Sequence, residues 1–179
     1  MSRALENDFS DIRLADKADA AAVADLYDRA RQIMRAQGNC SQWTDDYPGL
    51  QTALQDIRIK TLYVNDNCTA VMALIPGPDP TYAVIPDGQW KDDSPYAVIH
   101  RIASIEPGQG RKLIEYGLQK YGHLRIDTHE DNSGMRHLLK KMGFECCGTI
   151  ICRDGTPRLA YEISEVPDLG SVCSPVRAD

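Results

Sequence analysis

Apolar residues change their spacing several times along the chain, and each change marks a predicted element. Residues 11–15 alternate between polar and apolar positions, as a short strand does. From Asp16 the apolar residues recur at helical spacing, and Gly38 ends the pattern, which predicts a long helix with an aspartate cap and a glycine stop. Residues 50–59 repeat the helical spacing. The chain is therefore predicted to open with a strand and two helices.

The middle of the chain has the composition of strands joined by turns. Residues 61–64 and 68–75 are rich in β-branched and apolar side chains, and the Asn-Asp-Asn between them predicts a hairpin. Residues 76–95 are rich in proline, so we expect a loop there, with a short strand at 82–85. Residues 96–103 are the strongest candidate for a buried strand.

The last third of the chain alternates helices and strands. A turn at Gly108–Gly110 opens a predicted helix, and residues 124–128 predict the next strand. Residues 131–142 predict another helix, and 145–152 with 158–163 predict a closing hairpin. This order indicates an α/β (α+β) fold. Its crossover unit places the glycine turn at the carboxyl end of a strand, where ligands bind in open α/β sheets.

These elements fit one domain over residues 1–164, followed by a loose tail at residues 165–179. With 179 residues, of which 42% are hydrophobic, the chain can bury a core without disulfide or metal support. The net charge of −6 and the lack of a basic stripe argue against nucleic acid or a membrane surface as a partner. The chain has neither a long apolar run nor a leader-like amino terminus, so we expect a cytoplasmic protein.

The six cysteines are irregularly spaced, which predicts free thiols instead of a disulfide framework. There is no CxxC pair, and the adjacent Cys146 and Cys147 would point to opposite faces of a strand. We therefore expect no metal site.

Two glycines, a helix amino terminus and two cations come together in the segment Pro107-Gly108-Gln109-Gly110-Arg111-Lys112. Glycines let backbone amides approach an anion, and the helix terminus adds partial positive charge, so the segment suits a diphosphate. The same pattern also occurs as plain turn punctuation. It is neither a P-loop nor the three-glycine dinucleotide fingerprint.

A second motif follows the strand at 124–128. The strand ends in polar residues up to Asn132, and the helix after it closes at Gly143-Phe144. Taken with residues 96–111, this motif resembles the GNAT-type N-acetyltransferase superfamily over residues 12–163. The resemblance implies a central mixed, mostly antiparallel sheet of six to seven strands, flanked by about four helices.

The resemblance also implies acetyl-CoA as cosubstrate. The strand before the turn would pair with the pantetheine arm, the turn would hold the diphosphate, and an asparagine would contact the arm. The residues implied in this binding are Ile102, Ala103 and Ser104, then Gly108, Gln109, Gly110, Arg111 and Lys112, and finally Asn132.

Two positions depart from the family pattern. Ile105 stands where the family usually has Arg or Gln, three residues before the first glycine. Leu139 stands where the family often has a tyrosine that serves as general acid. The usual proton donor to the departing thiolate is therefore missing.

Direct transfer to an amine needs a base, because a protonated amine is not a nucleophile. His100 on the central strand and His129 at the exit of the next strand are the candidates, since histidine titrates near working pH. Each could instead be a structural, hydrogen-bonded histidine. Asp127 and Glu130 are acidic alternatives, and His123 is predicted to face solvent.

The loop between the first two predicted helices carries Trp43, Asp45, Asp46 and Tyr47, an aromatic and acidic set that suits an amine or a cationic substrate. The aromatics could equally be packing anchors. Tyr96 is predicted to close the other side of the substrate site. The expected acceptor is a small-molecule or peptide amine, and the resemblance makes a homodimer possible.

Three hypotheses follow. The first is an N-acetyltransferase that moves an acetyl group from acetyl-CoA to a primary amine by direct transfer. The second is a GNAT-like domain that binds acyl-CoA without turnover, as a sensor or interaction module, and Leu139 favours it. The third is a protein that assembles through the edge of its last hairpin and binds no ligand.

Overall fold

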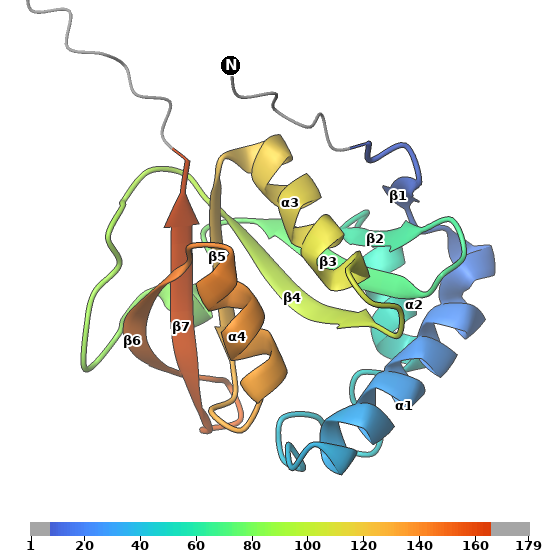
Figure 1. Ribbon diagram of the computed structural model, residues 1–179, viewed down its shortest axis with the longest axis horizontal. Coiled ribbons are helices and arrows are strands. Elements are labelled where there is room, and N and C mark those ends of the chain that lie inside the picture. Colours follow the sequence, from blue (N-terminus) through green and yellow to red (C-terminus); the bar gives the residue numbers. More distant parts are fainter. Residues whose placement is uncertain (1–7, 166–179) are drawn as a thin grey trace, which may run out of the picture.

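A single seven-stranded sheet organises the computed structural model, which describes residues 8–165 (Figure 1). Its strands are β1 (Ile12–Leu14), β2 (Leu62–Asn65), β3 (Ala70–Pro76), β4 (Ala97–Ser104), β5 (His123–Thr128), β6 (Glu145–Ile151) and β7 (Pro157–Ser164). The strand order is β1-β2-β3-β4-β5-β7-β6, and every pair is antiparallel except β4 with β5. The mixed, mostly antiparallel sheet predicted from the resemblance is confirmed. The predicted tail, apart from its first residue, lies outside the described residues.

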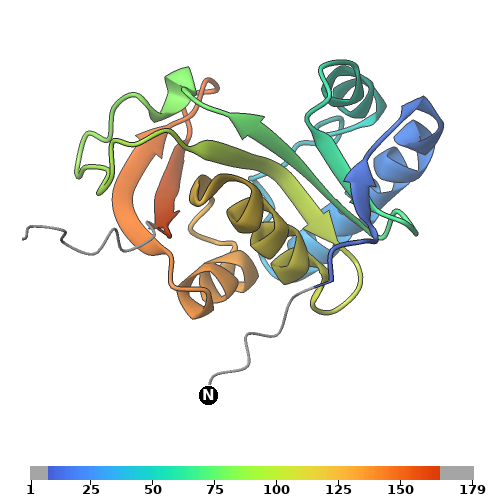
Figure 2. The same ribbon diagram turned by 90° about the horizontal axis from the view of Figure 1, so that it is seen from above.

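Four α-helices cover the two faces of the sheet. They are α1 (Ala20–Ala36), α2 (Leu50–Arg58), α3 (Gln109–Tyr121) and α4 (Ser133–Lys141), and the 3-10 turns are η1 (Lys17–Asp19) and η2 (Pro80–Tyr82). Helices α3 and α4 lie on one face of the sheet, and α1 and α2 lie on the other (Figure 2). Their apolar side chains pack into two separate core clusters. No helix within residues 8–165 is long and apolar enough to span a bilayer.

The first predicted helix and the proline-rich loop differ from expectation in detail. Asp16 caps a 3-10 turn by accepting a hydrogen bond from the Ala18 amide at 2.7 Å, so the α-helix begins four residues later. The predicted strand at 82–85 is wrong. Asp79 caps the turn η2 instead, accepting from the Thr81 amide, and Pro80 fixes the backbone angle that opens it.

The sheet splits at the carboxyl ends of β4 and β5. Their parallel ladder runs from Ala97–Leu124 to Ile99–Ile126 and then stops. At the same level β4 contains one residue more than β3, and the bulged Arg101 has a φ of 51°. A bulge bends its strand and increases the local twist. From His100 onward, β4 therefore turns away from β5 and leaves one of its edges without a partner strand.

The opposite, fully paired end of β4 and β5 is closed by a buried polar cluster. Glu162 of β7 lies 2.9 Å from His123 Nε2 and accepts a hydrogen bond from Arg125 Nε at 2.9 Å. Ser94 Oγ lies 3.0 Å from His123 Nδ1. The prediction that His123 faces solvent is wrong: it is 3% exposed because Glu162, far away in the sequence, lies beside it in the sheet.

Candidate active site

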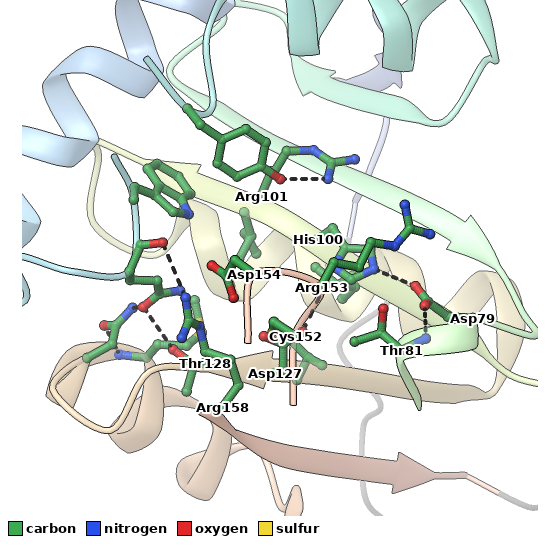
Figure 3. Close-up of a pocket in the computed structure, with 18 of the residues that line it drawn as sticks. Asp79, Thr81, His100, Arg101, Asp127, Thr128, Cys152, Arg153, Asp154 and Arg158 are labelled. Atoms are coloured by element: carbon green, nitrogen blue, oxygen red, sulfur yellow. Dashed lines mark hydrogen bonds and ion pairs between the residues drawn. The ribbon is translucent and has the colours of Figure 1, made fainter. Parts of the chain in front are cut away.

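A cavity of about 690 Å³ lies at the split between β4 and β5 (Figure 3). Its floor is formed by β4 and the end of β5, and its walls come from the loop between α1 and α2 and from the turn between β6 and β7. These four segments are far apart in sequence, so the fold assembles the cavity.

His100 lines this cavity and is held between two carboxylates. Its Nε2 lies 2.8 Å from Asp79 Oδ2, and its Nδ1 lies 3.9 Å from Asp127 Oδ1. The hydrogen bond from His100 lowers the pKa of Asp79 to about 2, so Asp79 is ionised at neutral pH. An ionised Asp79 accepts the Nε2 proton, which leaves Nδ1 as the acceptor of the neutral ring.

Tyr82 orients Asp127, because its hydroxyl donates a hydrogen bond to Asp127 Oδ1 at 2.5 Å. Burial raises the pKa of Tyr82 well above its ordinary value, so the hydroxyl keeps its proton and remains a donor. Burial, together with Asp127, also raises the pKa of the cavity-lining Cys152 to about 11, so that thiol is neutral. Asp127 and Nδ1 of His100 are thus the basic groups at the floor of the cavity.

Arg101, the bulged residue next to His100, ties β4 to α2. Its Nε and Nη2 donate to the two carboxylate oxygens of Asp56 at 2.8 and 2.9 Å, and its Nη1 donates to the Tyr47 hydroxyl at 3.2 Å. A two-point contact of this kind fixes the geometry of the guanidinium. It offsets the strain of a left-handed conformation at a residue other than glycine.

The second predicted base, His129, does not line the cavity. Its Nε2 lies 3.3 Å from Ser41 Oγ, and its Nδ1 accepts a hydrogen bond from the Asp131 amide at 3.2 Å. Of the acidic alternatives, Asp127 lines the cavity and Glu130 is exposed outside it. The structure therefore brings His100 and Asp127 together and leaves His129 and Glu130 outside.

Asn132 lines the cavity as the N-cap of α4. Its Oδ1 accepts from the Met135 amide at 3.1 Å, and its Nδ2 donates to Gln42 Oε1 at 3.1 Å. Gln42 also approaches the His129 amide at 3.4 Å, so it links the α1–α2 loop to the end of β5. Gln42 was not predictable from the sequence, because a lone glutamine in a loop carries no signal for a contact ninety residues away.

Of the three aromatic residues predicted for the substrate site, two line the cavity, and the acidic Asp45 and Asp46 do not. Trp43 is buried and packs edge-on against Tyr27, with ring centroids 5.7 Å apart, and Tyr47 is exposed beside Arg101. Tyr96 does not line it. Its hydroxyl accepts from the Asp79 amide at 3.1 Å, so Tyr96 acts on the cavity only by holding the residue that holds His100.

Comparison with known proteins places this geometry in a family. No family model matches the chain, and no match was found among curated proteins. Among solved structures, a GNAT-family acetyltransferase from Streptococcus agalactiae is 32% identical, with a TM-score of 0.73, and the match covers 86% of this chain and 94% of that one. The chain belongs to the GNAT acetyltransferase family. It is accordingly an acetyl-CoA-dependent acyltransferase.

Two more distant structures share the GNAT fold. An acetyltransferase of Salmonella typhimurium, solved with its cofactor acetyl-CoA, is 15% identical, covers 91% of this chain and 98% of its own, and has a TM-score of 0.58. A ribosomal-protein-alanine N-acetyltransferase of Brucella melitensis is 16% identical, covers 86% and 98%, and has a TM-score of 0.59.

The GNAT residues predicted to bind the pantetheine arm lie along the open part of β4. Ala103 and Ser104 pair with Val71 and Ala70 of β3, and Ile102 lines the cavity. The other edge of this segment has no strand beside it, because the ladder with β5 ends at Ile99. Its backbone groups are therefore available to an extended ligand, as the predicted role requires.

The predicted diphosphate turn lies at the amino terminus of α3. Gly108 has a φ of 82°, and a Cβ built on it would meet nothing within 4 Å. The Gln109 amide donates to the Glu106 carbonyl at 3.4 Å, whereas the first-turn amides of Gly110 and Arg111 have no acceptor within the helix. The turn thus has open space and two backbone donors for an anion.

The two cations of this turn have acidic partners. Arg111 Nε lies 2.7 Å from Glu115 Oε1, and Lys112 Nζ lies 2.6 Å from Asp11 Oδ1. The backbone amides of this turn, and not the two paired side chains, are therefore the donors available to an anion. Leu139, at the usual tyrosine position, is fully buried in the core beneath α4.

Proposed function

We propose that this GNAT protein is an N-acetyltransferase that moves an acetyl group from acetyl-CoA to a primary amine of a small molecule or peptide by direct transfer. The observation that carries the proposal is the position of His100. It lies at the point where β4 leaves β5, lines the cavity, and is held by an ionised Asp79.

His100 is the proposed base. In its neutral form Nε2 donates to Asp79 and Nδ1 takes a proton from the acceptor ammonium, which becomes a nucleophilic amine. Asp127, 3.9 Å from Nδ1, attracts the ammonium before transfer and faces the imidazolium after it. Asp79 thus orients the ring and stabilises its positive charge, as the carboxylate does in other Asp-His pairs.

Bound acetyl-CoA supplies the activated acetyl thioester. The amine nitrogen forms a bond to the acetyl carbon while the carbon–sulfur bond breaks, and the electron pair of that bond leaves with the sulfur. The proton that the attacking nitrogen still carries passes through water to the departing thiolate, because Leu139 stands in place of a tyrosine. The bulged segment after His100 has free backbone groups that would hold the pantetheine arm, and the turn at Gly108 would hold the diphosphate.

The family and one of the neighbours support an amine as acceptor. The Brucella structure is named for N-acetylation of an alanine of a ribosomal protein. In this chain the acceptor side is lined by Trp43, Tyr47 and Asp127, which combine aromatic faces and negative charge. Both attract an ammonium group.

Thiol release from acetyl-CoA, measured over a panel of primary amines with the products identified by mass spectrometry, tests the proposal. We expect a new amide and one equivalent of free CoA for each amine consumed. Thermal unfolding with acetyl-CoA separates the alternative, because a ligand that binds only the native state raises the midpoint. A raised midpoint without any product would indicate the non-catalytic acyl-CoA-binding domain, which the buried Leu139 favours.

A further inference from the structure

Arg158, at the start of β7, is a buried cation without an anionic partner. It is 6% exposed and lines the cavity. Its Nη1 donates to Thr156 Oγ1 at 2.7 Å and to the Pro157 carbonyl at 2.9 Å, and its Nη2 donates to the Gln42 carbonyl at 3.5 Å. These acceptors are all neutral, and the guanidinium forms no ion pair within residues 8–165.

Two other arginines of the sheet have carboxylate partners. Arg101 has a two-point contact with Asp56, and Arg125 donates to Glu162 while it lies between the rings of Trp90 and Tyr96. Burying a charge without a counter-charge is expensive, so buried cations are normally paired. The missing counter-charge at Arg158 is on the cavity side, where a substrate would supply it.

A second arginine lines the same cavity. Arg153, in the β6–β7 turn, is exposed and makes no hydrogen bond or ion pair within the described part of the chain, and its guanidinium points away from that of Arg158 (Figure 3). Asp154 lines the cavity too, but its Oδ1 accepts from the amide and hydroxyl of Thr156 at 2.9 and 2.5 Å, and it forms no ion pair with Arg158 within residues 8–165. This wall therefore carries two cations and one anion, while Asp79 and Asp127 make the floor anionic.

We propose that the acceptor is an amino acid, whose carboxylate binds Arg158 while its amine reaches His100. This inference rests on the proposed N-acetyltransferase function and names its substrate class. The planar fork of a guanidinium matches a carboxylate with two parallel hydrogen bonds. A simple amine would satisfy the floor of the cavity and leave Arg158 without a counter-charge.

The anion is assigned to the acceptor and not to CoA, because the donors suited to the diphosphate lie at the amino terminus of α3. Gly108 and the first-turn amides there do not line the cavity. Arg158 is instead fixed by the α1–α2 loop and the β6–β7 turn, the two segments that wall the acceptor side.

The test measures kcat/KM for the twenty common amino acids with acetyl-CoA. Each accepted amino acid is compared with its amide and with the amine that lacks the carboxylate, and an aminoalkyl phosphate tests the other oxyanion. We expect the amino acid to be preferred over the matched amine by about 10- to 100-fold, the effect of charge-assisted hydrogen bonds to one guanidinium.

Substitutions then connect that preference to Arg158. In Arg158→Gln the advantage of the amino acid over the matched amine should shrink, through a higher KM for the amino acid. Turnover of the matched amine should fall less than that of the amino acid, and Arg153→Gln, whose guanidinium points away from that of Arg158, should change the preference less. Arg158→Lys keeps the charge without the fork and should retain part of the preference. Arg29→Gln on the exposed side of α1 is the control.

The outcomes are distinguishable. If amines are acetylated but amino acids are not preferred, or if the arginine variants lower all substrates equally, the amino acid assignment is overturned and the N-acetyltransferase function stands. Preference for the aminoalkyl phosphate would overturn the amino acid assignment and mean that Arg158 binds a phosphate of the acceptor instead of a carboxylate. No product from any amine would overturn both. Because Arg158→Lys keeps the buried charge, this variant stays informative even if Arg158→Gln fails to fold.

Discussion

Two histidines flanked by carboxylates lie at opposite ends of the junction between β4 and β5. His123 lies where the two strands are paired. It contacts Glu162 and Ser94, and Arg125 binds the same Glu162. His100 lies where the ladder stops, between Asp79 and Asp127, and is 22% exposed at its side chain. The residue types are nearly the same, and the surroundings differ.

At the paired end the polar groups satisfy one another. Glu162 accepts from His123, from Arg125 and from the Lys91 amide, so both of its carboxylate oxygens are occupied. At the split, Nδ1 of His100 has no hydrogen-bond partner among residues 8–165, because Asp127 lies beyond hydrogen-bond distance. The place where the β4–β5 ladder ends, more than the choice of residues, therefore distinguishes a structural histidine from a candidate base.

The largest effect is expected at His100. His100→Ala should lower kcat on the order of 10²–10⁴-fold, as loss of a general base does, while the stabilisation by acetyl-CoA is kept. Single-turnover rates and thermal unfolding with acetyl-CoA measure the two quantities. His137→Ala, an exposed histidine of α4, is the matched control.

His129→Ala is the competing variant. Because His129 does not line the cavity, its loss should lower kcat less than the loss of His100 does. A larger loss at His129 would transfer the role of base to it.

Glu162→Gln tests the structural end of the comparison. The change leaves a buried arginine without its counter-charge, which destabilises a protein by about 3–5 kcal/mol. Urea unfolding measures this loss, and turnover per folded molecule should be unchanged at a temperature where the variant is folded. A variant that unfolds like the wild type but turns over slowly would mean that this cluster belongs to the active site.

Gly108→Val separates backbone strain from cosubstrate binding, with Gly38→Val as its match. Both glycines have a positive φ, and a Cβ on either meets nothing within 4 Å. Both variants should lose about 1–2 kcal/mol of stability, because a side chain is strained in this conformation. Only Gly108→Val should also lose the rise in thermal midpoint with acetyl-CoA. Equal responses to acetyl-CoA would remove the turn from the proposed site.

Much of the fold was predictable because its signals are local. The glycine turn and the hairpins depend on a few neighbouring residues, and each is found where the spacing predicts it, whereas the helix predicted over 131–142 begins at Ser133 after an N-cap at Asn132. The strand predicted at 82–85 failed because the apolar residues there pack against β6 and β7 from within a loop. An apolar run alone does not distinguish these two arrangements.

The site was predictable only in part because its pairings are long-range. His100 and Asp127 were found as types of residue that carry chemistry, but Asp79 was missed, since nothing in a proline-rich loop announces that it will reach β4. Gln42 and Arg158 were missed for the same reason. Their contacts join segments that meet only once the sheet has formed.

The smallest effect is expected at Asp79, the carboxylate that binds His100. Its pKa of about 2 in the folded protein lies below the ordinary value of 3.8, so its ionised form stabilises the fold above about pH 4. That contribution is lost as the pH falls from about 4 toward 2, where the carboxyl takes up a proton. Wild type should therefore be more stable than Asp79→Asn at pH 6, and the difference in the free energy of unfolding should disappear near pH 2. Asp25→Asn, at an exposed position of α1, is the control and should show no such convergence. A difference that is the same at both pH values would mean that the charge of Asp79 does not hold His100, and the base would then be oriented by Asp127 alone.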